Sequence, residues 1–200
     1  MLNITSRISF SKDAKRRIKK FYKKNKGGLD SSSWANISKN VKNEISRKLF
    51  AKDGYKCIYC ERYLIALSPE IDHFAHKAAY PQFTFTTVNF FYSCGFCNST
   101  SRKGQKSTIL SLHQYYNRCI FNIIHPYYDD PNNEIKFQDA DRIKLDWDNC
   151  TIKGKATIDF FHYNDTIMTM IRSRDLGIDR LNPLLSSDER KLIQESIAYK

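Results

Sequence analysis

Two Cys-x-x-Cys pairs constrain this chain more than any other feature of its sequence. The pairs are Cys57/Cys60 and Cys94/Cys97, with 33 residues (61–93) between them. Each pair can form a tight knuckle with both sulfurs on one side, and two knuckles close a tetrahedral zinc site with no open position. The usual gap between such pairs is roughly 15–20 residues. The sequence therefore predicts a structural zinc ion and a further element between the knuckles, in preference to chance motifs or a redox dithiol.

Disulfides are the alternative use of the six cysteines in this chain. The first ten residues contain neither a sustained apolar run nor a small-residue cleavage site, so we expect no secretory signal and a cytoplasmic location. In that reducing compartment the Cys-x-x-Cys spacing favours zinc over disulfides. Cys119 and Cys150 lie outside both pairs, and we expect them to be buried or idle thiols.

The chain carries a net charge of +12, and most of that excess lies near its start. Residues 11–26 contain nine Lys or Arg and one Asp, a net charge of +8. Such an excess indicates a polyanionic partner, either nucleic acid or an anionic membrane. No apolar run approaches the roughly 18–20 residues that cross a membrane. Ile18, Phe21 and Tyr22 recur at helical spacing, which predicts a basic helix that docks on a duplex backbone, or alternatively a solvated helix or a flexible arm.

A chain of 200 residues, of which 41% are hydrophobic, is long enough for one domain with extensions. We divide it into a basic leader (1–39), a core (40–110) and a C-terminal extension (111–200) that is a candidate docking region for a partner. The expected fold class is α+β, with a small zinc-stapled core, flanking helices and a mixed C-terminal extension.

Local patterns predict the elements of this fold. Apolar positions from Trp34 to Phe50 recur at three- and four-residue steps, which predicts one amphipathic helix or two short ones. The core then reads as strand, strand, loop and helix, with Asn98 or Ser99 as the cap of the helix. The other predicted elements are strands at 63–65, 71–74, 135–137, 143–147 and 151–158, a helix after Asn164 or Asp165 that ends by Gly177 or Pro183, and a last helix over 186–199 with capping-box spacing.

The segment between the knuckles also carries residues suited to cutting a phosphodiester. Asp72 and His73 belong to a predicted strand, Asn89 lies further on, and Asn98 comes directly after Cys97. Cleavage needs a base to deprotonate water and a cation to stabilise the transition state and the leaving oxygen. Histidine supplies a base with a pKa near neutrality, and carboxylate and amide oxygens suit Mg²⁺. Each residue alone is a weak indication, and their position between the cysteine pairs strengthens it.

This arrangement resembles the HNH, or ββα-metal, nucleases in their zinc-stapled form, over about residues 45–106. The resemblance implies a small ββα-metal core with His73 as the general base. It also implies that Asp72 and Asn98 hold a catalytic Mg²⁺ or Mn²⁺ ion and that Asn89 orients the loop. The cysteines that it assigns to the structural zinc are Cys57, Cys60, Cys94 and Cys97.

A finer resemblance is to the HNH subunit of Septu-type and retron-associated anti-phage systems. It rests on residues 71–74 with Lys77, on Tyr80-Pro81, on residues 94–98, and on the later run 125–131, which reads HPYYDDP. The resemblance implies that the chain is the nuclease effector of an anti-phage defence system and that it acts with an ATPase partner.

Two positions depart from the family pattern. His76 stands where the family commonly has Pro, and an exposed side chain is a simpler interpretation than a phosphate or metal contact. Arg102, one helical turn past Asn98, cannot bind a metal, which favours Mg²⁺ or Mn²⁺ with water ligands over a transition metal. The residues predicted to contact phosphate groups of a nucleic acid are Arg102, Lys103, Lys106 and Lys77.

Three functions agree with these residues. The first is a metal-dependent endonuclease that hydrolyses DNA, since HNH chemistry does not need a 2′-hydroxyl. The second is a zinc-stapled nucleic-acid-binding protein without catalysis, which explains the leader and the knuckles but not the Asp-His-Asn set. The third is an HNH-type nuclease that acts on RNA. A membrane partner is not expected in any of the three.

Overall fold

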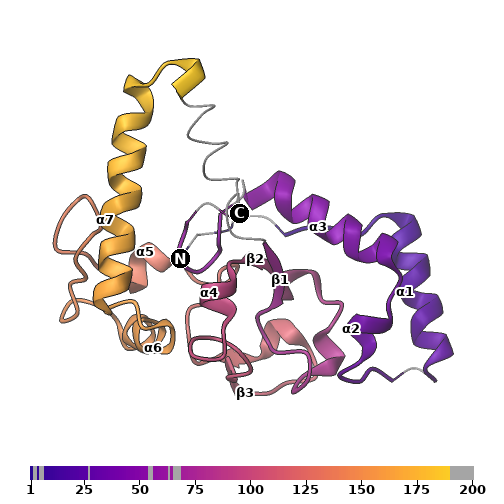
Figure 1. The fold of residues 1–200 in the computed structure, drawn as a ribbon. Helices are drawn as coiled ribbons and strands as arrows, with labels where there is room; N and C mark the ends of the chain where they lie inside the picture. The colour runs from indigo at the N-terminus through magenta and orange to yellow at the C-terminus, as the bar shows by residue number, and fades with distance from the viewer. Residues whose placement is uncertain are drawn as a thin grey trace.

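A computed structural model gives the arrangement of the chain (Figure 1). It has mixed α and β structure, with small two-stranded sheets and several helices, in agreement with the predicted α+β class. None of the helices in the described part of the chain is long and apolar enough to cross a membrane. The residues that the structure describes are 1, 4, 7–26, 28–53, 56–62, 64 and 69–189.

The basic segment near the start of the chain forms helix α1 (Lys12–Lys24). Ser11 caps this helix, because its Oγ accepts a hydrogen bond from the backbone N–H of Ala14 at 3.1 Å. Ala14 and Ile18 are buried on its inner side. The Ser11 hydroxyl in turn donates to the carboxylate of Glu44 at 2.6 Å. The segment is therefore a helix that packs on the rest of the protein rather than a flexible arm.

The amphipathic stretch that follows forms two helices, α2 (Ser33–Asn36) and α3 (Lys39–Asp53). Val41, Ile45 and Leu49 repeat every four residues along α3 and are fully buried. Through this stripe α3 packs against the second strand of the central hairpin. The sequence predicted one amphipathic helix or two short ones, and the structure has one short helix of 4 residues followed by a longer one of 15 residues.

A two-stranded antiparallel hairpin lies at the centre of the molecule (Figure 1). Its strands are β1 (Glu70–His73) and β2 (Phe90–Ser93), and helix α4 (Gly95–Asn98) follows β2 almost directly. Strand β1 corresponds to the strand predicted at 71–74, but the sequence did not predict β2, and the other expected strand, 63–65, lies largely outside the described residues. Helix α4 has four residues and lies inside the second knuckle, so Asn98 is its last residue and not its cap. The 3-10 helices between the strands are η1 (Pro81–Phe83) and η2 (Thr87–Asn89).

The register of this hairpin decides which side chains share a face. His73 lies opposite Phe90, and Glu70 lies opposite Ser93. Because side chains alternate along a strand, Asp72 points to the same side as Glu70 and His73 points to the other side. The two acidic residues therefore lie on one face of β1, while the histidine lies on the opposite face.

The C-terminal half begins with a small second sheet and ends with longer helices. In Figure 1, the last long helix, α7, extends away from the central hairpin. The elements in chain order are β3 (Ile109–Ser111), η3 (Tyr116–Arg118), β4 (Ile120–Phe121), α5 (Pro131–Glu134), α6 (Ile152–Phe161), α7 (Thr166–Leu181) and η4 (Asn182–Leu184).

The prediction of a strand over 151–158 is wrong, because this segment begins α6. Thr151 caps the helix, since its Oγ1 accepts a hydrogen bond from the backbone N–H of Gly154 at 3.0 Å. A Cβ atom at position 154 would lie 2.0 Å from the carbonyl oxygen of Glu134. Gly154 therefore permits close packing between α6 and α5.

One further prediction of the C-terminal half needs correction. The strands expected at 135–137 and 143–147 are reduced to one isolated bridge between Phe137 and Leu145. The helix expected after Asn164 or Asp165 is present as α7, which passes through Gly177 and ends at Leu181, before Pro183.

Some predicted elements fall partly outside the described residues. Ser186 and Glu189 do form a capping box, because the Ser186 N–H donates to the Glu189 carboxylate at 2.8 Å and the Glu189 N–H donates to the Ser186 hydroxyl at 3.2 Å. Residues 190–199 of the predicted last helix lie outside the described part, as do residues 63 and 65 of the predicted strand 63–65.

The buried hydrophobic residues form a core that draws on all three predicted parts of the chain. Ile18 of the leader, Phe90 of the central segment and Phe161 of the extension all belong to it. The leader and the extension therefore pack together with the central segment, and they help to position the residues around the hairpin.

Candidate functional site

The four cysteines of the two knuckles come together beside the central hairpin. Their sulfur atoms all lie within 4.8 Å of one another, and the Sγ atoms of Cys60 and Cys94 are 3.8 Å apart. A tetrahedron with Zn–S bonds of about 2.3 Å has S–S edges of about 3.8 Å. The donor set therefore fits a zinc ion, as the spacing of the cysteine pairs predicted.

The electrostatics of this cluster also favour a bound cation. Hydrogen bonds from the neighbouring thiols, Cys57 first, lower the pKa of Cys94. Backbone groups help, because the N–H of Cys97 donates to the Cys94 sulfur at 3.4 Å. The proximity of Cys57 and the other thiols raises the pKa of Cys97. Four thiolates at this spacing repel one another, so the fully deprotonated cluster requires a cation such as Zn²⁺.

His73, the predicted base, lies at the end of β1 with only 3% of its surface exposed. Its Nε2 is 3.1 Å from the carbonyl oxygen of Thr84. A carbonyl can only accept, so Nε2 carries the hydrogen and Nδ1 holds the free lone pair when the ring is neutral. Burial, with a further contribution from the charge of Lys77, lowers the pKa of His73 to about 3. The ring is therefore neutral at physiological pH.

Aromatic rings cover the imidazole of His73. The ring centroid of Trp34 in α2 lies 4.7 Å away in an edge-on arrangement, and that of Phe90 lies 5.1 Å away. The sequence offered no indication of this cover, because Trp34 belongs to a helix 39 residues earlier in the chain.

Asp72 is buried on the opposite face of β1, where two groups hold its carboxylate. The hydroxyl of Tyr59 donates to one oxygen, and the ammonium group of Lys103 donates to the other at 3.0 Å. The same ammonium donates to the backbone carbonyl of His73 at 2.9 Å. The negative charge of Asp72 is thus balanced by the ammonium group of Lys103.

Asn89 is fully buried and fixes the loop that follows β1. Its Oδ1 accepts from the N–H of Ala75 at 2.7 Å, and its Nδ2 donates to the carbonyl of Ala75 at 3.2 Å. The same Nδ2 donates to the carbonyl of Phe83 at 3.1 Å, and the Tyr116 hydroxyl donates to Oδ1 at 2.9 Å. Three of these bonds join the backbone at Ala75 to that at Phe83, and the fourth links Asn89 to the side chain of Tyr116.

Asn98 and Asp72 are not engaged in one site. The Nδ2 of Asn98 donates to the carboxylate of Glu70 at 2.7 Å, whereas Asp72 is held by Tyr59 and Lys103. Among the described residues, the cysteine cluster is the one group of three or more Cys, His, Asp or Glu side chains close enough to share an ion. As arranged, Asp72 and Asn98 do not fit a shared catalytic metal.

Two of the four predicted phosphate contacts are interior side chains, which corrects their assignment. The guanidinium of Arg102 stacks on Phe96 at 4.0 Å and donates to the carbonyls of Phe161 and His162. Lys103 is fully buried. Neither side chain faces solvent as a contact to a nucleic acid requires. Lys106 is exposed and Lys77 is half-buried, so those two positions remain accessible.

His76 is half-buried rather than fully exposed. Burial, with contributions from the charges of Lys103 and Lys77, lowers its pKa. Its ring therefore favours the neutral form, and no contact with a ligand follows from its position.

A turn at Gly104 explains why Lys103 points inward. The φ angle of Gly104 is +45°, and a Cβ atom there would lie 2.8 Å from the Cα of Thr100. This turn lets the N–H of Lys103 donate to the carbonyl of Cys97 at 3.1 Å. The sequence predicted a regular helix here, in which Lys103 would have been solvated.

The chain is similar to part of a phage protein. Protein ea31 of Escherichia phage lambda is 35% identical over 81 residues, which make up 40% of this chain and 24% of that protein. The chain thus covers about a quarter of the relative's length. No family model matches the chain, and no solved structure matches it.

Proposed function

We propose that the chain is a metal-dependent endonuclease of the HNH type that hydrolyses phosphodiester bonds of DNA. The observation that carries the proposal is the hydrogen bond from Nε2 of His73 to the carbonyl of Thr84. It selects the tautomer in which Nδ1 is unprotonated, and an unprotonated nitrogen is what a general base needs to accept a proton from water.

The frame around His73 supports this role. The histidine lies at the end of the first strand of a hairpin that a short helix and a cysteine cluster complete. Asn89 holds the following loop through both backbone groups of Ala75. A base that acts on a bound phosphodiester must keep a fixed position, because small displacements are costly in rate.

The cover over His73 adds a requirement to the proposed reaction. Trp34 and Phe90 pack against an imidazole that is 3% exposed, so water does not approach it freely. A shift of the segment that carries Trp34 is therefore part of the proposed activity. Water and phosphate at the uncovered ring would also raise its low pKa and make it a stronger base.

The resemblance to HNH nucleases implies Mg²⁺ or Mn²⁺ held by Asp72 and Asn98, which would require both side chains to exchange their present partners, Lys103 and Glu70, for the ion. Such an ion would stabilise the charge that develops on the phosphate. Because Lys103 and Glu70 engage these two side chains, we assign no reaction step to the ion. Dependence of cleavage on added Mg²⁺ or Mn²⁺ is instead a measurable part of the proposal.

A zinc-stapled nucleic-acid-binding protein without catalysis is the second candidate function. The buried pair of Asp72 and Lys103 favours it, because that pair uses the carboxylate for stability. An HNH-type nuclease that acts on RNA is a variant of the first proposal, and an assay with both substrates separates the two.

We further propose that the nuclease serves an anti-phage defence system together with an ATPase partner. This part rests on the motif resemblance around Tyr80-Pro81 and residues 125–131. Purification of the tagged chain from its native host tests it. A stoichiometric ATPase is the expected companion, and its absence under conditions that retain other complexes would contradict this part of the proposal.

The nuclease proposal is tested with the purified full chain, supercoiled plasmid DNA and Mg²⁺ or Mn²⁺, with the ATPase partner added once it is known. We expect nicked or linear DNA from the wild-type protein and at least a roughly 100-fold slower reaction from His73→Ala, as loss of a general base predicts. His113→Ala is the matched control, since His113 lies in a loop before η3 and is predicted to leave the rate unchanged.

Two measurements make the outcome decisive. Zinc content and circular dichroism must be the same for His73→Ala and the wild type, so that loss of fold is not mistaken for loss of the base. Equal cleavage rates for the two proteins would exclude His73 as the base. DNA binding without cleavage by the wild-type protein, in the presence of its partner and either metal, would support the binding function instead.

A further inference from the structure

Helix α1 has two faces of opposite character, and only the apolar one is used in the fold. Ala14 and Ile18 are 1% and 8% exposed. Phe21 and Tyr22 pack on Phe85, with ring centroids 6.0 and 6.2 Å from it. The helix is thus fixed to the body of the protein along one side.

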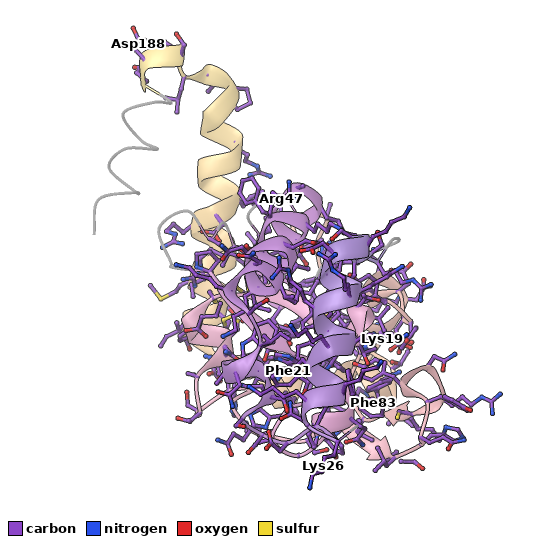
Figure 2. All side chains as sticks on the ribbon, turned by 90° about the vertical axis from the view of Figure 1, so that its right-hand side faces the viewer. Lys19, Phe21, Lys26, Arg47, Phe83 and Asp188 are labelled. Atoms are coloured by element: carbon purple, nitrogen blue, oxygen red, sulfur yellow. The ribbon has the colours of Figure 1, made fainter. Side chains whose placement is uncertain are left out.

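The other side of α1 is a row of exposed basic residues. At 100° per residue, Lys12, Arg16, Lys19 and Lys23 fall on one line along the helix, opposite the buried Ala14. Figure 2 looks onto this helix, with Lys19 labelled on it and Lys26 near its C-terminal end. We define the α1 basic face by its exposed members, which are Lys12, Lys15, Arg16, Lys19, Lys20, Lys23 and Lys24.

Few carboxylates neutralise this face. Asp13 is the acidic residue of α1, and it pairs with Arg16 and Arg17 at 2.5 Å. Glu44 on the neighbouring helix is bound by Ser11 and Lys48. Among the described residues, no carboxylate forms an ion pair with a lysine of the α1 basic face. The face therefore presents a concentrated positive charge to solvent.

The packing of α1 distinguishes between two anionic partners. A basic helix that binds a membrane inserts its apolar face among the lipids. The apolar face of α1 is already covered by the protein, since Ile18 is buried and Phe21 rests on Phe85. What remains is charge without apolar surface, which suits a phosphate backbone rather than a lipid surface.

We propose that the α1 basic face binds the phosphate backbone of duplex DNA without regard to base sequence. The 13 residues of α1 extend over about 20 Å, long enough to follow several phosphates. Lysines at such a face act as mobile point charges, which contact phosphates and carry no base specificity. The interaction is separate from the predicted contacts at Lys77 and Lys106.

The position of α1 relates this binding to the candidate base. Phe21 of α1 contacts Phe85, the ring of Phe85 lies 6.5 Å from Trp34, and Trp34 covers His73. DNA on the α1 basic face would therefore lie on the His73 side of the hairpin. This placement of the DNA near His73 rests on the proposed nuclease function, whereas the binding of DNA to the α1 basic face does not.

Salt dependence of binding tests the proposal. The probe is a fluorescent DNA duplex of about 25 base pairs and arbitrary sequence, titrated by anisotropy with the full zinc-loaded chain. Each phosphate contact contributes about −0.9 to the slope of log affinity against log salt. The triple variant Lys19→Gln/Lys20→Gln/Lys23→Gln should therefore reduce the slope by about 3. When salt is raised from 50 to 200 mM, the factor by which affinity falls should be about 40 times smaller for this variant than for the wild type.

A matched control removes the same charge elsewhere. The variant Arg118→Gln/Lys144→Gln/Arg174→Gln changes three exposed residues of the C-terminal extension. We expect it to keep the wild-type slope within about 1. Equal slopes for the two triple variants would overturn the proposal. Tighter binding of the wild type to anionic phosphatidylserine vesicles than to the duplex would also overturn it.

The outcome is separable from that of the nuclease proposal. Binding of the zinc-loaded chain is measured without added Mg²⁺ or Mn²⁺ and repeated with His73→Ala, which retains the α1 basic face. A protein that binds through α1 but never cuts would contradict the nuclease proposal alone. A protein that cuts, while the α1 variant binds DNA with the wild-type slope, would contradict this inference alone.

Discussion

The ammonium group of Lys103 lies 3.0 Å from the carboxylate of Asp72, and both side chains are buried. The backbone N–H of Lys103 also donates to the carbonyl of Cys97, and its ammonium donates to the carbonyl of His73. One residue therefore joins the second cysteine knuckle to the end of β1. Because a buried charge is costly without its partner, this ion pair should matter greatly for stability.

Lys103→Met should destabilise the protein by about 3–5 kcal/mol, because it leaves the carboxylate of Asp72 buried with the Tyr59 hydroxyl as its remaining partner. Methionine keeps most of the apolar volume of lysine, so the loss reports on charge. The measurement is urea unfolding of the zinc-loaded protein.

The double variant Asp72→Asn/Lys103→Met separates the charge from the packing. It should recover part of the stability that Lys103→Met loses, since no unpaired charge remains. A loss below about 1 kcal/mol for Lys103→Met would show that Asp72 does not depend on this lysine. It would then favour the role of Asp72 as a metal ligand.

Cys97→Ser should abolish stoichiometric zinc binding and cooperative unfolding, because the free energy of a structural zinc site is folding free energy. Zinc released on denaturation is measured with a chromogenic chelator, alongside thermal unfolding. Cys150→Ser is the control, as Cys150 lies outside the cluster. A Cys97→Ser protein that retained one zinc ion per chain would contradict the assignment of the cluster.

The low pKa of His73 predicts a loss of stability in mild acid. Its folded pKa of about 3 lies below the value of about 6.5 in an unfolded chain, so the unfolded state binds the proton more readily. Its contribution is present above pH 6.5 and is lost as the pH falls towards 3. The wild type should lose about 1 kcal/mol more than His73→Gln between pH 6.5 and 5.5.

Unfolding of both zinc-loaded proteins by urea at the two pH values measures this difference. The contribution of His125, whose pKa burial also lowers, is common to both proteins and cancels. An identical pH dependence for the wild type and His73→Gln would mean that His73 is solvated and titrates normally.

The local features of the candidate site were predictable because they depend on spacing along the chain. Two Cys-x-x-Cys pairs define four donors, and an antiparallel hairpin brings residues before and after a 16-residue connection together. Glu70 also had a signal, because a strand places it on the same face as Asp72 two residues later. Period-two alternation thus places Glu70 and Asp72 on one face, but it does not predict that Glu70 contacts Asn98.

The long-range contacts had no comparable signal. Burial of Lys103 depends on a turn at Gly104, and the cover over His73 depends on how α2 packs against β2. Arg102 is buried because the carbonyls at the end of α6 need donors, 59 residues further along the chain. Charged residues at helical spacing look solvated in the sequence until tertiary packing gives them partners.

Trp34→Ala should uncover His73 and raise its pKa from about 3 towards 6.5, because burial is the largest cause of the low value. Titration of the imidazole signals by NMR measures the change, and we expect a rise of at least about 1 unit. Under the nuclease proposal the same variant should also cleave DNA faster. Trp147→Ala, which removes a tryptophan that is 39% exposed, is the control. If Trp34→Ala folds with its zinc but leaves the pKa of His73 unchanged, then Phe90 and the strand itself bury the ring, and movement of α2 would not expose the base.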